Sequence, residues 1–128
     1  MLKSFSYEQL LSALFGIQDI FERGRGQFFL VGDTLVSAIN SLELDGDKIT
    51  VGVKRAELTE GAKEVMKTAK TPDSWTDTEI VYTFSDVPVH IKIYADDIIE
   101  LQNPETIVYA YEVFNIPNPY KTFLQKNL

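Results

Sequence analysis

The sequence predicts an α+β fold, in which helices pack against a sheet of four or five strands. Three observations predict it. An amphipathic helix starts near the N-terminus, a short buried strand runs through Gly32 into a second helix, and two later segments alternate between apolar and polar residues. The 128 residues, 45% of them hydrophobic, are enough for one globular domain, and we expect residues 1–128 to form it.

The first helix has the clearest start. Ser6 and Gln9 are spaced as a capping box, in which two side chains satisfy free N–H groups at a helix N-terminus. Between Tyr7 and Phe21 apolar residues recur at helical spacing, so one side of the helix faces a core. The sequence Gly-Arg-Gly at 24–26 ends it.

Residues 28–31 form a continuous apolar run that predicts a buried strand. Gly32 follows directly, and Asp33 or Thr34 is expected to cap a second helix that extends to Leu42. A strand that runs through glycine into a helix leaves backbone N–H groups free, and such groups suit a phosphate.

The alternation in residues 48–54 predicts a strand with one buried face. Ile49, Val51 and Val53 share that face, whereas Lys48 and Thr50 point to the other side together with Gly52. A third helix is expected at residues 59–70.

Residues 80–84 and 87–94 are expected to pair as a hairpin around Ser85 and Asp86. In the second arm His90 and Lys92 share the polar side. Pro88 cannot donate a ladder hydrogen bond, so the start of this arm is expected at an edge or a bulge.

The tail gives weaker signals. Residues 106–114 are rich in β-forming residues and predict one further strand, and Asn118 begins a short closing helix with Pro119 as its first helical residue. Four acidic residues around residues 86–100 are expected to be solvated charges: Asp86, Asp96, Asp97 and Glu100.

The composition narrows the possible partners. A net charge of −7 argues against nucleic acid, which is bound through Lys/Arg clusters, but it is compatible with a small phosphorylated ligand. No apolar run reaches the roughly 20 residues of a membrane span, so we expect no membrane partner. There is no cysteine and no export signal, and we expect a cytoplasmic location.

Four blocks, in order, resemble LicD-type and related small nucleotidyltransferases. Residues 29–38, FLVGDTLVSA, are similar to the block FLVGGTLLGA of that family, and residues 49–53 look like the end of its strand DDDIDVGM. Residues 89–94 resemble the strand with its third aspartate, and residues 115–124 its closing segment. The resemblance implies a mixed sheet with helices mainly on one face, and Mg²⁺-dependent transfer of a nucleotidyl group from a nucleoside triphosphate to a small acceptor.

The match breaks down at the metal ligands. Lys48 and Thr50 stand where the family has paired aspartates, Lys92 stands at the third aspartate, and Asp33 replaces the second glycine. Ammonium groups repel a divalent cation. We therefore expect a catalytically degenerate binding or regulatory module without a cofactor. Its candidate ligand-binding residues are Gly32, Asp33, Thr34, Lys48, Thr50, His90 and Lys92.

A plainer interpretation stands beside this one. Lysines are commonly solvated surface charges, so Lys48 and Lys92 are more simply expected to pair with Asp33, Asp47 or another acid on the sheet face. His90 is the only histidine, and a lone histidine without an evident partner is more often structural than catalytic.

Two other functions stay open at this point. In a shifted register Asp45 and Asp47, with Asp33, would be the catalytic, metal-binding residues of an active Mg²⁺-dependent nucleotidyltransferase. That register would place Gly46 and Lys48 at positions that should be apolar. Alternatively, the chain is a structural or protein-interaction subunit that binds a protein partner and keeps only the scaffold.

Overall fold

The structure, a computed structural model, describes residues 4–127. The helices in this range are α1 (Tyr7–Arg23), α2 (Gly32–Ile39), α3 (Glu60–Ala69) and α4 (Tyr120–Lys126), with 3-10 turns η1 (Arg55–Glu57) and η2 (Ile99–Leu101). The strands are β1 (Phe29–Leu30), β2 (Ile49–Lys54), β3 (Ser74–Trp75), β4 (Glu79–Phe84), β5 (Val87–Tyr94), β6 (Glu105–Tyr109) and β7 (Glu112–Ile116). No helix in this range is long and apolar enough to span a membrane.

The strands form one mixed sheet in the order β3-β4-β5-β2-β1-β7-β6. β2 runs parallel to β5 and β1 runs parallel to β7, whereas the other neighbours are antiparallel. The predicted α+β class is thus confirmed. The sheet has seven strands instead of four or five, partly because β3, only two residues long, gives too short a pattern to be recognised.

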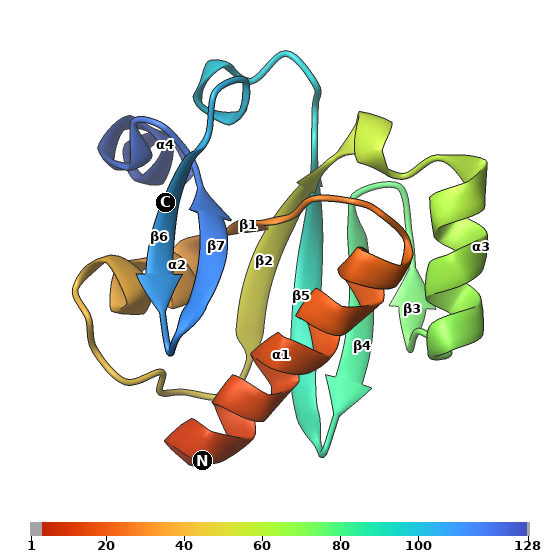
Figure 1. Ribbon diagram of the computed structural model, residues 1–128, viewed down its shortest axis with the longest axis horizontal. Coiled ribbons are helices and arrows are strands. Elements are labelled where there is room, and N and C mark those ends of the chain that lie inside the picture. Colours follow the sequence, from red (N-terminus) through yellow and green to blue (C-terminus); the bar gives the residue numbers. More distant parts are fainter. Residues whose placement is uncertain (1–3, 128) are drawn as a thin grey trace.

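The main core lies between the sheet and the helices α1 and α3. Figure 1 shows α1 lying across the front of the sheet with α3 beside it. The capping box is formed as predicted, because the Gln9 backbone N–H donates to Ser6 Oγ and the Ser6 N–H donates to Gln9 Oε1. The hydroxyl of Tyr82 donates to the carbonyl of Met66 at 3.0 Å, which ties β4 to α3.

A second, smaller apolar cluster lies on the opposite face of the sheet. Phe29, Val31, Leu101 and Phe123 are buried there, and Tyr94 packs against them. The rings of Tyr94 and Phe123 meet edge to face, with centroids 5.4 Å apart. η2 and α4 therefore cover this face at the end where β5 finishes.

The tail and the second helix differ from the sequence prediction. Residues 106–114 form a hairpin, not one strand, because Ala110 and Tyr111 turn the chain with φ of 52° and 68°. Neither residue is a glycine or asparagine, so the turn carries no sequence signal. α2 ends at Ile39 instead of reaching Leu42, and α4 begins at Tyr120, with Pro119 as its N-cap.

The position of Pro88 explains how a proline enters an inner strand. It pairs with Thr83 of β4, but β2 begins opposite Val89, one residue later. The start of β5 is thus unpaired on its β2 side, as the missing N–H requires.

Candidate ligand-binding site

The register of β2 decides which side chains share the candidate site. β2 begins at Ile49, and its Ile49, Val51 and Val53 are buried in the main core, as predicted. Thr50 lies opposite His90 of β5, and Gly52 lies opposite Lys92. Since side chains alternate along a strand, these four residues lie on the face turned away from α1. We call this side of β4, β5 and β2 the polar face.

The corner at Gly32 lies beside the polar face. Gly32 has a φ of +57°, which favours glycine, and a Cβ there would lie 3.8 Å from Thr50 Cβ. Thr34 is buried in the first turn of α2, and its Oγ1 accepts the backbone N–H of Thr50 at 3.0 Å. The predicted capping of α2 by Asp33 or Thr34 is wrong, because Val31 is the N-cap and makes no side-chain hydrogen bond to the helix.

The predicted ligand-binding residues differ in their accessibility. Gly32, Asp33, Lys48 and Lys92 are exposed and His90 is half-buried. Thr34 and Thr50 are only 4% and 8% exposed. The register places Thr50, His90 and Lys92 together, and α2 holds Gly32 close to Thr50.

The next polar-face position of β2 is filled by neighbouring side chains. A Cβ on Gly52 would lie 2.7 Å from Tyr94 Cε2 and 3.0 Å from Val31 Cγ1. A side chain therefore fits at position 52 only if its neighbours move. Burial raises the pKa of Tyr94 to about 12, so this phenol stays neutral. The end of β2 near α4 is thus an apolar part of the polar face.

The lysines do not form the pairs expected of solvated surface charges. Within residues 4–127, neither Lys48 nor Lys92 lies within 4.0 Å of a carboxylate oxygen. The expected pairing with Asp33, Asp47 or another acid is therefore wrong in the described part of the chain. Both ammonium groups are exposed and available to an anion.

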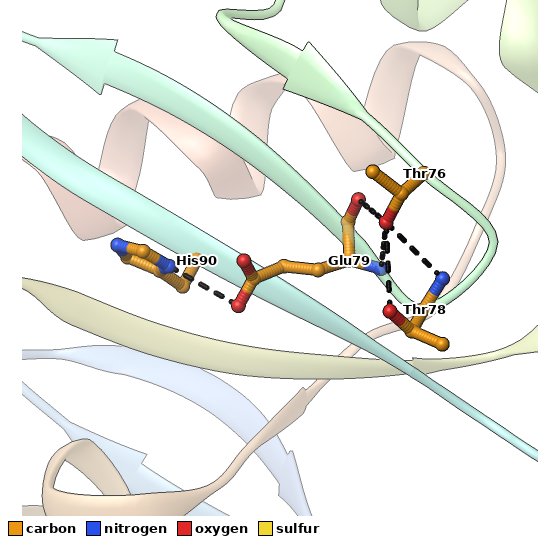
Figure 2. A network of polar contacts seen from close by, with 4 residues as sticks. All are labelled: Thr76, Thr78, Glu79 and His90. Carbon is orange, nitrogen blue, oxygen red and sulfur yellow. Dashed lines mark hydrogen bonds and ion pairs between the residues drawn. The ribbon is translucent and has the colours of Figure 1, made fainter.

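His90, by contrast, has a partner that the sequence analysis missed. Its Nδ1 lies 3.1 Å from Oε2 of Glu79, and the two side chains are 29% and 37% exposed (Figure 2). The hairpin pairs Phe84 with Val87, and counting back along both strands puts position 79 opposite position 92. The two-residue turn of the predicted hairpin therefore indicates that Glu79 lies on this part of the sheet, opposite Lys92. It does not indicate that the carboxylate pairs with His90, two residues back along β5.

A turn before β4 fixes the backbone of Glu79. Thr76 Oγ1 accepts the Glu79 N–H at 3.1 Å and the Thr78 N–H at 3.3 Å (Figure 2). The Thr76 backbone N–H donates to the Glu79 carbonyl at 2.9 Å. The carboxylate thus extends toward the ring from an anchored backbone.

The carboxylates of the alternative register lie elsewhere. Asp45 and Asp47 precede β2, and the carbonyl of Gly46 between them accepts the backbone N–H of Phe5 at 2.9 Å. Among residues 4–127, no three His, Cys, Asp or Glu side chains are grouped so as to hold a metal ion. An active enzyme would need Asp45 and Asp47 to move from the loop before β2 into the candidate site.

One of the acids expected to be solvated is buried. The side chain of Glu100 is 1% exposed, and Lys126 Nζ lies 2.9 Å from its Oε2. The hydrogen bond from Lys126 holds the pKa of Glu100 below its ordinary value, although burial acts in the opposite direction. The prediction for Glu100 is wrong because α4, distant in sequence, covers this carboxylate.

Comparison with known proteins shows the fold. No family model matches the sequence, and no curated protein sequence matches it. The structure is similar to the crystal structure of a Thermotoga maritima protein described as a putative nucleotidyltransferase, with a TM-score of 0.55 and 12% identity over 91% of this chain and 85% of that chain. The arrangement of α1, the Gly32 corner and the mixed sheet is therefore a nucleotidyltransferase-like α+β fold.

Proposed function

We propose that this chain is a catalytically degenerate nucleotidyltransferase-like domain that binds a small phosphorylated ligand, such as a nucleotide, as a binding or regulatory module. The observation that carries the proposal is that Lys48 and Lys92 are exposed and have no carboxylate partner among residues 4–127, at positions where the resembling family has metal-binding aspartates. A lysine ammonium attracts a phosphate directly, whereas an aspartate needs an intervening cation.

Two further features support a role in binding. Thr50 stands at the position of the second paired aspartate, and its backbone N–H is already bound by Thr34. Farther along β2, Gly52 matches the glycine of the family's strand and lies under Tyr94, so no side chain projects from that position. The exposed part of the polar face beside His90 offers the ammonium group of Lys92 to an anion.

The decisive experiment is a thermal-shift titration with inorganic phosphate and nucleotides, with and without Mg²⁺. A ligand that binds only the native state stabilises it by about 2.7 kcal/mol at one hundred times Kd. We expect phosphate to raise Tm without Mg²⁺, and Lys48→Ala or Lys92→Ala to remove most of that rise.

Lys63→Ala is the matched control, because Lys63 lies on α3 and its partner Glu60 is 94% exposed, so their pair contributes little to stability. It should leave the phosphate response unchanged. A rise in Tm that requires both Mg²⁺ and a triphosphate, and is lost in Asp45→Ala or Asp47→Ala, would instead support the active enzyme.

A protein-interaction role has an observation of its own. Val108, Tyr111 and Val113, on the β6–β7 hairpin, are 72%, 100% and 60% exposed. Apolar side chains on an edge hairpin are typical of a surface that another chain covers. If no phosphate compound shifts Tm, this role becomes the better supported one.

A further inference from the structure

The surroundings of His90 give its two ring nitrogens different roles. Nδ1 lies 3.1 Å from Glu79 Oε2, and Figure 2 shows the other ring nitrogen, Nε2, pointing away from Glu79. An ionised carboxylate only accepts hydrogen bonds, so Nδ1 must carry the proton that it donates. In the neutral ring Nε2 then keeps a free lone pair.

The pairing of Glu79 is selective. The register places Glu79 directly opposite Lys92, yet the carboxylate pairs with the ring of His90, and no ion pair with Lys92 forms. The ammonium of Lys92 therefore stays available on the same face. The turn at Thr76 anchors the strand end from which Glu79 reaches the ring.

The His90 ring and the Lys92 ammonium lie on the same face of β5, where one ligand can contact both groups. His90 and Lys92 are two residues apart on β5, so their side chains leave the same face roughly 7 Å apart along the strand. The ring is 29% exposed, and Lys92 is exposed. Nε2 points away from Glu79, so the flexible side chain of Lys92 must extend along the strand for one phosphate to meet both groups, and its four-carbon stem is long enough for that.

We propose that Glu79 is a positioning residue that holds His90 in the Nδ1–H tautomer, so that Nε2 takes the proton of a terminal phosphate group held by Lys92. This inference rests on the proposed phosphate-binding function and narrows its ligand to phosphate monoesters. A diester has no such proton and carries only one negative charge.

The proton transfer is simple. The O–H bond of a phosphate monoester monoanion breaks, an N–H bond forms at Nε2, and no other covalent bond changes. The ligand becomes a dianion and the ring becomes an imidazolium, whose Nδ1–H still donates to Glu79. Each charge then has an opposite neighbour, and the new N–H···O bond is charge-assisted.

The bound complex carries one more proton than the separate neutral ring and dianionic ligand. Binding at high pH must therefore take up a proton, so the affinity of the chain for the phosphate monoester falls as the pH rises. The charged groups on the segments that flank this face come from five places. Glu79 lies on β4, Lys92 on β5, Lys48 just before β2 and Asp33 on α2, and Asp73, just before β3, bonds Thr83 on β4. The two lysines favour the bound dianion, and the acids favour the imidazolium.

The tautomer can be measured without any ligand. His90 is the only histidine in the chain, so long-range ¹H–¹⁵N NMR of an untagged protein reports on this ring alone. In the neutral ring we expect a protonated Nδ1 and an unprotonated Nε2. Glu79→Gln should give a mixture of tautomers. Asp86→Asn, the same change of charge in the hairpin turn, should leave the spectrum as it is. A dominant Nε2–H tautomer in the native chain would overturn the inference.

Ligand specificity is measured with methyl phosphate and dimethyl phosphate by calorimetry at neutral pH. We expect methyl phosphate to bind at least about tenfold more tightly, the order expected for one charge-assisted hydrogen bond. His90→Gln should remove that preference, Glu79→Gln should reduce it, and Asp86→Asn should preserve it.

The results separate this inference from the proposed function. If methyl phosphate binds the native chain and His90→Gln equally well, the role of His90 is wrong while phosphate binding stands. If neither compound binds, both proposals fail, whatever tautomer the ring adopts.

Discussion

At the scale of single residues, Thr34 is a polar side chain whose hydrogen bond is made within the fold and not to a ligand. The sequence assigns it to the ligand site or to a helix cap, but its Oγ1 accepts the N–H of Thr50 and the side chain is 4% exposed. α2 thereby occupies the place beside β2 that a longer β1 would take. Thr34 supports the site by fixing Thr50.

Thr34→Val tests this role because it keeps the shape and removes the acceptor. A buried N–H without a partner costs about 1–3 kcal/mol, so urea denaturation should show a loss of that order. The Thr50 amide should also exchange faster with solvent. Thr34→Ser keeps the hydroxyl and should keep the amide protected; fast exchange in both variants would assign the effect to packing.

The sequence predicts the shared face of the site better than it predicts burial. Strict alternation in residues 48–54 and 87–94 placed Thr50, His90 and Lys92 on the side away from the core, and the structure agrees. The burial of Glu100 depends on a helix that follows 20 residues later, so no local pattern indicates it.

At the scale of elements, α4 and η2 close one end of the polar face through Phe123, Leu101 and one ion pair. Lys126 is the partner of the buried Glu100 carboxylate, and Oε1 of Glu100 has no hydrogen-bond partner among the described residues. α4 has only seven residues, too few to be stable alone, so its position depends on these contacts.

The pair makes the docking of α4 sensitive to acid. The folded-state pKa of Glu100 is below the ordinary value of 4.5, so the stabilisation is fully present above that pH and is lost as the pH falls through the lower, folded-state pKa. Lys126→Met leaves a buried charge without a partner and should lower Tm at pH 7. The difference from the native chain should shrink below about pH 4.5.

Lys121→Met is the control on the exposed side of α4 and should change Tm little at any pH. The double variant Glu100→Gln/Lys126→Met should show no acid-dependent difference of this kind. If Lys126→Met lowers Tm equally at pH 3 and pH 7, the ion pair is not the cause.

Elements with a strong periodic pattern were predictable, and those defined by turn geometry were not. The capping box and apolar spacing located α1, and the alternating strands located β2, β4 and β5. The β6–β7 hairpin was missed because its turn residues, Ala110 and Tyr111, are uncommon at positive φ.

At the scale of the whole molecule, protection from solvent decreases from the centre of the sheet to its edges. β2 lies between β5 and β1 and is buried on both faces over residues 49–53. β6, at one edge, has Glu105, Thr106 and Val108 exposed.

We therefore expect native-state hydrogen exchange to follow the strand order. The amides of Val51 and Ile91 should exchange about a hundredfold or more slowly than the outward-facing amides of β6, because inner strands open only with the whole fold. Exchange of β6 as slow as that of β2 would show that another chain covers this edge, and would favour a protein-interaction role.

The fold class was predictable at this scale, and the strand order was not. The α+β class followed from periodicity and from the resemblance of four blocks. The order β3-β4-β5-β2-β1-β7-β6 depends on pairs such as Phe29 with Asn115, which are far apart in sequence and leave no local signal.

The crowding above Gly52 sets a limit on protein engineering. A designer who restores acidic side chains for a magnesium site would change positions 48, 50 and 92, and would have to leave position 52 as glycine. Any Cβ there would collide with the ring edge of Tyr94, 2.7 Å away, and with Val31. Making room at position 52 would require trimming Tyr94, which also removes its contact with Phe123 and loosens the C-terminal helix. Variation at this one position is thus tied to repacking of the tail.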